Sequence, residues 1–176
     1  RGNLADMPPP RQFPDGREWT IGTPDLIVSS PETKVEAVAA DWHGYWRPTP
    51  TGMKEERYIK AVEVHEVRVG QGGAGAARTG GLGGYSVIHH AGITAGQATE
   101  ALDHGPVMTE GFAMTHEAGQ NATVYPDGMG VRLTPGSSLA WRVHTHSFGE
   151  EATVRIDVGF KFHPKGYQPK YTLKGS

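Results

Sequence analysis

The chain has 176 residues, with 17 Lys and Arg against 19 Asp and Glu, nine His and no Cys. Near balance of charge without a basic stripe argues against nucleic-acid binding, and no apolar run reaches the roughly 18 residues of a membrane span. Without cysteine there are no disulfides or thiolate sites, so a metal ion would need histidine, methionine, carboxylate or backbone oxygen ligands.

Proline and glycine dominate the turns of the first third of the chain, and we predict that residues 1–19 form an extended lead-in arm. The short apolar run LIV (26–28), closed by a proline, predicts one edge strand. Alternation in VEAVA (35–39) favours a second strand over a helical turn. The stretch HGYWRPTPTGM (43–53) is interpreted as a loop.

The middle of the chain holds the clearest regular segments. RYIKAVEVHEVRVG (57–70) is rich in Val and Ile and predicts a long strand, and YSVIHHAGI (85–93) predicts another. The glycine-rich segment 70–84 between them lacks the strand-to-helix context of a dinucleotide site and the Gly-Lys-Ser/Thr of a phosphate loop, so we interpret it as a connection. Residues 94–123 are polar and are expected to be irregular.

The last third predicts strands near 130–134, 138–146 and 152–163, separated by Pro-Gly and Gly-Glu turns. No segment has a capped apolar stripe of period 3.6, so the chain is expected to be all-β, an antiparallel sandwich with long proline- and glycine-rich loops. The period-two alternation of these strands predicts that one set of apolar side chains lines the core. This set comprises Leu139, Trp141, Val143, Val154, Ile156, Val158 and Phe160.

Two histidine pairs are the candidate metal ligands. His144 and His146 share one face of their strand, which places two imidazoles side by side as a metal ion requires. His89 and His90 are adjacent, so they face opposite ways unless a bulge bends the strand, or unless one binds through Nδ1 and the other through Nε2. The alternative for each pair is a set of solvated or hydrogen-bonded histidines without an ion.

The remaining histidines are assigned to surface or packing roles, because they lie in loops or among aromatic and charged neighbours. These are His43, His65, His104, His116 and His163. Glu150 and Glu151 lie in a turn and are interpreted as solvated, with support of a ligand histidine as the alternative. Neither a nucleophile motif nor a carboxylate pair with the spacing of a glycosidase stands out.

Five motifs occur in an order that resembles a known family. They are EWTIGTPDLIVSSP, RYIKAVEVHEV, YSVIHHAGI, YPDGMGVRLTPGSSLAWRVHTHSFGEE and VGFKFHPKGYQPKY. Together they resemble a bacterial branch of the copper type II, ascorbate-dependent monooxygenases, whose animal members are the peptidylglycine α-hydroxylating and dopamine β-monooxygenases. The resemblance runs from roughly Gly16 to Tyr171 and is most specific at the two histidine pairs.

The resemblance implies a jelly-roll sandwich over residues 20–171, followed by a tail at 172–176. The family has two consecutive jelly rolls, each with one copper. The first copper takes a His-His pair and a third histidine and relays electrons, and the second, on two histidines and a methionine, activates oxygen. By order, His89 and His90 match the pair and His144 the third ligand, with His146 as an extra. The His-x-His also resembles the second-domain motif, but the flanking strands fit less well.

The chain departs from the family because nothing after Tyr171 could form a second sandwich. We therefore expect one module of a periplasmic or secreted oxidoreductase that binds one copper, with zinc as an alternative ion, and is not active alone. Its partners would be other domains or subunits of a larger assembly. The alternative is a non-catalytic structural or accessory sandwich that packs on such an assembly.

Overall fold

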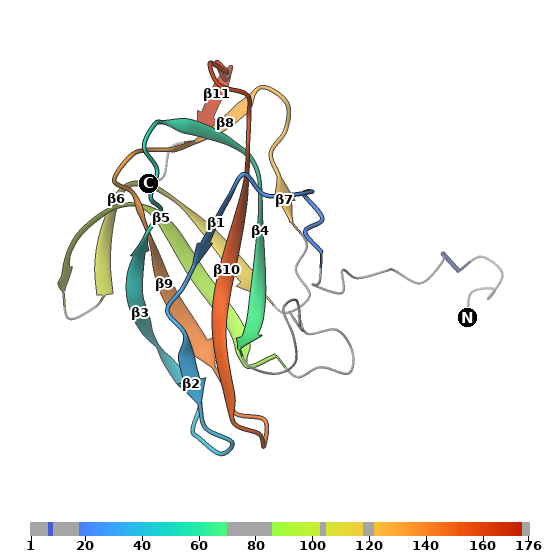
Figure 1. Cartoon of the computed structure of the whole chain (residues 1–176), viewed down its shortest axis with the longest axis vertical. Coiled ribbons are helices and arrows are strands. Elements are labelled where there is room, and N and C mark those ends of the chain that lie inside the picture. Colours follow the sequence, from blue (N-terminus) through green and yellow to red (C-terminus); the bar gives the residue numbers. More distant parts are fainter. Residues whose placement is uncertain (1–6, 9–17, 70–85, 103–104, 118–121, 174–176) are drawn as a thin grey trace.

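The computed structural model describes residues 7–8, 18–69, 86–102, 105–117 and 122–173 (Figure 1). Most of the predicted lead-in arm and all of the glycine-rich connection lie outside these residues. The predicted division into arm, sandwich and tail stays a prediction.

The regular elements of the described residues are all strands, which confirms the predicted all-β class. They are β1 (Leu26–Ser29), β2 (Thr33–Val35), β3 (Trp42–Pro50), β4 (Arg57–Val69), β5 (Ile88–Leu102), β6 (Gly105–Glu117), β7 (Thr123–Val124), β8 (Met129–Leu133), β9 (Ser138–Thr145), β10 (Ala152–Phe162) and β11 (Tyr171–Leu173). Within the described part of the chain, no helix is long and apolar enough to cross a membrane.

The strands form two sheets that face each other as a sandwich (Figure 1). One sheet has the order β1-β10-β4-β8-β11, with β2 beside β10 and β7 beside β4, and the other has the order β3-β9-β5-β6. Without the short strands β2, β7 and β11, the eight remaining strands run first-eighth-third-sixth in one sheet and second-seventh-fourth-fifth in the other. This is the order of a jelly roll, two Greek keys wrapped together.

The core between the sheets is built from the alternating strands that the sequence predicted. Leu139, Trp141 and Val143 of β9 have no exposed surface, and the same holds for the apolar residues Val154, Ile156, Val158 and Phe160 of β10. The indole Nε1 of Trp141 donates to Thr49 Oγ1 at 3.2 Å, so this large buried side chain leaves no unpaired donor.

Two regions expected to be irregular are strands instead. The segment 43–53, interpreted as a loop, is largely β3, because it pairs with β9 along most of its length and buries Trp46. Residues 94–123, expected to be irregular, contain the second half of β5 and all of β6, which form a long hairpin. In both cases pairing with a neighbouring strand overrides a weak local propensity. The strand expected over 35–39 ends at Val35.

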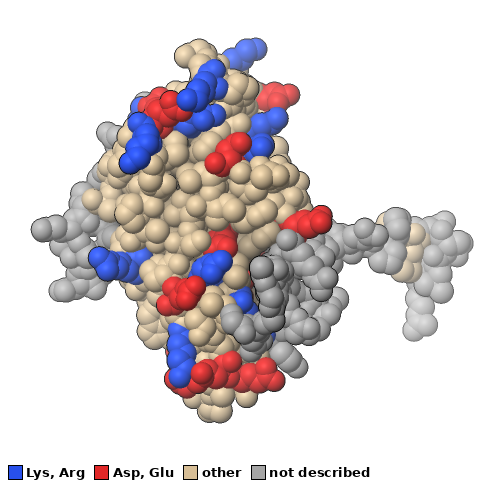
Figure 2. Space-filling model, viewed as in Figure 1, with Lys and Arg blue, Asp and Glu red and all other residues tan. Residues whose placement is uncertain are grey.

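Charged side chains of both signs are interspersed on the face shown in Figure 2, and no continuous basic stripe crosses it. A largely uncharged band crosses the upper middle of this face, with charged side chains above it and below it.

One core position holds a titratable group. His116 of β6 pairs with Ala91 of β5 and follows Phe112 and Met114 on the face that points into the sandwich. Its side chain is buried, its Nε2 has no hydrogen-bond partner among the described residues, and burial lowers the pKa of the imidazole to about 4. His116 is therefore neutral in the folded protein at neutral pH, and it lies in a strand rather than in the expected loop.

We expect His116→Leu to reduce the loss of unfolding free energy that occurs as the pH falls from 6.5 to 4. Because the folded pKa is below the unfolded value, the unfolded chain binds more protons between pH 6.5 and pH 4, and stability falls as the pH falls through this window. The shift corresponds to about 3 kcal/mol in total. Urea unfolding of the metal-free protein at pH 7.0 and pH 4.5 measures the loss, and equal losses in the wild type and in His116→Leu would contradict this assignment.

Candidate metal centre

The candidate metal centre is a row of histidines on the outer face of the β3-β9-β5-β6 sheet. Strand β9 lies between β3 and β5, and His144 of β9 is the register partner of both His43 of β3 and His90 of β5. Residues directly opposite on paired strands share a face, with Cβ atoms about 4.5–5.5 Å apart. The strand register alone therefore places three imidazoles side by side.

A β-bulge brings the fourth histidine to the same face. Ile88 pairs with Thr145 and His90 pairs with His144, so that β5 advances two residues where β9 advances one. The extra residue is His89, whose Nδ1 lies 3.3 Å from Nδ1 of His144. The bulge expected from the adjacent histidines is thus present, and both side chains of the pair lie beside His144.

The spacing of the rings suits a metal ion. His43 Nε2 lies 3.3 Å from His90 Nε2, and ligand atoms of His43, His90 and His144 all lie within 4.8 Å of one another. Two nitrogens bound to a tetrahedral ion at 2.0–2.1 Å are about 3.3 Å apart, which is the separation observed between His43 and His90.

Five imidazoles form one contiguous group, which we call the histidine cluster: His43, His89, His90, His144 and His146. The ring of His89 lies 5.2 Å from those of His90 and His144 and 5.5 Å from that of His146. The structure thus brings together all four histidines predicted from sequence. It adds His43, whose ring is 4.0 Å from His144 and which had been assigned a surface or packing role. A strand prediction for residues 42–50 would have identified His43 as a candidate ligand.

The surroundings of His43 favour its neutral imidazole. Partial loss of hydration lowers the pKa of His43, and the nearby His144, His90 and Arg142 lower it further, while Asp41 opposes them. A lowered pKa favours the unprotonated ring that a metal ion requires. Asp41 Oδ2 also lies 3.4 Å from Nε2 of His144, where a carboxylate can fix the ring orientation.

A buried carboxylate holds the segment that leads into the bulge. Glu66 of β4 is 1% exposed, and its two oxygens accept the backbone N–H groups of Val87 and Ile88 at 3.1 and 3.2 Å. The hydroxyl of Ser86 donates to the same carboxylate at 2.5 Å. Burial raises the pKa of Glu66, and these hydrogen bonds act against that effect. The carboxylate therefore determines where β5 begins, directly before His89.

His65 and His163 have their ring contacts outside the cluster. His65 is buried, its Nε2 is 2.9 Å from Oε1 of Glu63, and its ring stacks on Trp19 at 3.9 Å, so its predicted packing role holds. His163 is buried and stacks on Tyr167 at 3.7 Å. His104 lies outside the described residues.

Asp41, which was not considered from sequence, is a carboxylate beside the cluster. Glu151 forms an ion pair with Lys34 at 2.8 Å, and Glu150 is exposed at the same turn.

Comparison of the chain with protein-family models, with curated protein sequences and with solved structures found no match. The chemical capacity of the site follows from its donors. Three imidazoles from adjacent strands, with two further imidazoles beside them, can hold one metal ion with a coordination position left for another histidine or for water.

We expect Glu66→Gln to loosen the segment before the bulge. The amide has one acceptor oxygen in place of two, which leaves a buried backbone N–H unpaired and costs about 1–3 kcal/mol. Hydrogen exchange at Val87 and Ile88 should accelerate, and urea unfolding should show the lost stability. The exposed Glu36→Gln is the matched control and should change neither quantity. Unchanged exchange in Glu66→Gln would contradict the anchoring role.

Proposed function

We propose that this chain is a copper-binding module that passes single electrons within a larger periplasmic or secreted oxidoreductase. The observation that carries the proposal is the row formed by His43, His144 and His90, whose ligand atoms lie within 4.8 Å of one another. Imidazole ligands without thiolate suit copper and accept both Cu(I) and Cu(II). Zinc is the alternative ion for the same donor set.

The exposure of the cluster favours electron transfer over a purely structural metal. His43 and His89 are exposed, and His90 and His144 are half-buried, so a redox partner can approach the site closely. Structural metal sites are closed by four protein ligands. Here the row supplies three, which leaves one position open. A one-electron ion on an open sheet face is suited to exchange electrons with a docked domain or subunit.

The resemblance to the copper type II monooxygenases supports the same proposal. It implies that His89, His90 and His144 hold the electron-relaying copper. The group whose ligand atoms lie within 4.8 Å of one another is instead His43, His90 and His144, with His89 beside His144. In that family a second copper, in a second sandwich, activates oxygen. The described residues form one sandwich with one such histidine group, so oxygen activation would fall to a partner domain or subunit.

We expect the purified protein to bind one Cu(II) ion. His144→Ala should abolish stoichiometric binding, because His144 lies between His43 and His90 in the row. Loss of a residue that only supports a ligand weakens metal binding about 10- to 100-fold. His43→Ala and His90→Ala each remove a ligand, so each should weaken copper binding by more than this. His146→Ala should weaken it only modestly. Isothermal titration calorimetry at pH 7.5 gives stoichiometry and Kd, with His163→Gln as a control outside the cluster.

Two outcomes of this titration would contradict the proposed site. If the wild type binds no copper or zinc, the sandwich is a structural or accessory module instead. If His146→Ala loses as much affinity as His144→Ala while His43→Ala loses none, the ion lies at the other end of the cluster.

We further expect that ascorbate reduces the copper of this 176-residue chain without hydroxylation of a peptidylglycine substrate. A single histidine-bound copper accepts one electron, whereas the family reaction needs a second copper. Loss of the Cu(II) electron paramagnetic resonance signal on adding ascorbate measures the reduction, and mass spectrometry of the substrate measures hydroxylation. Steady copper-dependent turnover by the chain alone would refute the relay role.

A further inference from the structure

Arg142 of β9 lies beside the row of His43, His144 and His90. It precedes His144 by two residues, so both side chains point from the same face of the sheet, about 6.6 Å apart along the strand. Its charge reaches the row, because it contributes to the lowered pKa of His43. Arg142 is exposed, and it forms no ion pair or hydrogen bond with the other residues that the structure describes.

Open space lies next to Arg142 on the side of β5. The register partner of Arg142 on that strand is Gly92, which follows His90 by two residues and so belongs to the same face. A Cβ atom at Gly92 would lie 4.0 Å from the Cβ atom of Arg142 and closer to no other described atom outside its chain neighbours. A small ligand at this position would therefore have the guanidinium on one side and the imidazole of His90 on another.

Negative charge borders the row elsewhere. Asp41 Oδ2 lies 3.4 Å from Nε2 of His144, and the exposed Glu117 of β6 is the register partner of His90. An anion that approaches the row near either carboxylate is repelled, whereas an anion that approaches over Gly92 meets the charge of Arg142. The surface charges therefore favour one direction of approach for an anionic ligand.

The chemistry of the row also favours an anion. Imidazole ligands are neutral, so three of them leave the whole charge of a bound ion uncompensated, and a fourth coordination position stays open. A guanidinium presents parallel N–H donors that match two oxygens of a planar oxyanion. A planar oxyanion therefore has oxygens enough for both the open position and the guanidinium.

We propose that the open position of the metal centre takes a small planar oxyanion, such as a carboxylate, and that Arg142 holds this ligand over Gly92. One oxygen is directed at the histidine row, and another accepts hydrogen bonds from the guanidinium. The inference rests on the proposed metal binding and adds the class of ligand that the exposed face of the ion accepts.

The test is a titration of the Cu(II)-loaded protein with formate, in a buffer free of other carboxylates. Visible absorption and electron paramagnetic resonance report entry of the anion into the copper coordination sphere. Arg142→Gln should bind one copper and weaken formate binding about ten-fold, the low end for a charge-assisted hydrogen bond. Arg142→Lys, which keeps the charge without the planar fork, should restore part of the loss.

Arg47→Gln is the matched control for charge. Arg47 is exposed on β3, forms no ion pair with the residues that the structure describes, and lies farther from the histidine row than Arg142 does. At about 0.15 M ionic strength its charge is largely screened, so this variant should leave formate binding unchanged.

Gly92→Val tests the position of the ligand. The added side chain fills the open space, and valine suits a strand, so the variant should fold and bind copper but lose formate binding. If copper binds and formate leaves its spectra unchanged, or if Arg142→Gln and Arg47→Gln lose formate affinity equally, the inference is overturned while the copper site stands. Unchanged formate binding in Gly92→Val would overturn it as well. A chain that binds neither copper nor zinc would overturn both this inference and the proposed function.

Discussion

The pairing of β9 with β3 on one side and with β5 on the other is the constraint on which both the core and the histidine cluster depend. Along β9, Trp141 and Val143 face the sandwich interior, and His144 faces outward between His43 and His90. A slip of one residue would reverse these faces, exposing the largest buried side chain and burying an imidazole. The burial of Trp141 therefore maintains the register that aligns the three imidazoles.

The bulge at His89 adds a fourth imidazole to a row that a regular ladder would limit to three. An extra residue disrupts the local ladder and leaves backbone groups to be paired elsewhere. Glu66 accepts two N–H groups just before the bulge, and Val87 O accepts the backbone N–H of His146 at 3.0 Å. A carboxylate from the facing sheet thus supports the irregular backbone of the cluster, at the expense of burying an ionisable group.

Much of the sandwich could be predicted because its central strands alternate strictly. Leu139 to Val143 and Val154 to Phe160 indicate their buried faces without any tertiary information. The His-His pair also indicated a bulge as one of two ways in which adjacent side chains on a strand could reach one ion, and the bulge is present. These signals are local in the sequence, and the structure follows them.

The contribution of β3 could not be predicted in the same way. Its glycine and two prolines resemble a loop, and it is a strand because β9 offers a partner, with a register irregularity between Trp46 and Thr49 close to the prolines. His43 is therefore brought to the site by pairing with a strand about 100 residues later in the chain. The small residues of the β5–β6 hairpin likewise have weak local strand propensity, and they form strands because β5 and β6 pair with each other.

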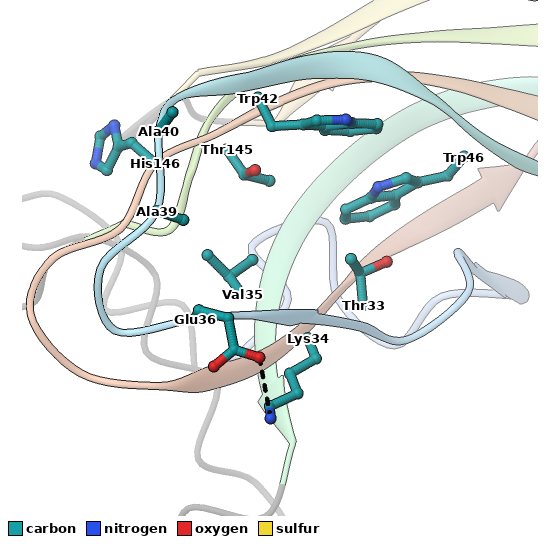
Figure 3. A pocket seen from close by; sticks show the side chains of 10 residues that line it. All are labelled: Thr33, Lys34, Val35, Glu36, Ala39, Ala40, Trp42, Trp46, Thr145 and His146. Carbon is teal, nitrogen blue, oxygen red and sulfur yellow. Dashed lines mark ion pairs between the residues drawn. The ribbon is translucent and has the colours of Figure 1, made fainter.

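One face of the end of β3 serves the histidine cluster, and the other lines a pocket of about 340 Å³ between the sheets (Figure 3). His43 points toward the imidazoles, and Trp42, the adjacent residue, lines the space between the sheets. Strand alternation thus places a candidate metal ligand and a pocket-lining indole next to each other.

The most direct test of the copper site is an anomalous difference map at the copper edge from crystals loaded with one equivalent of Cu(II). The predicted result is a single peak about 2.0–2.1 Å from ring nitrogens of His43, His90 and His144. Absence of a peak at the histidine cluster would contradict the proposed copper site. A peak that contacts none of these three histidines would contradict it as well.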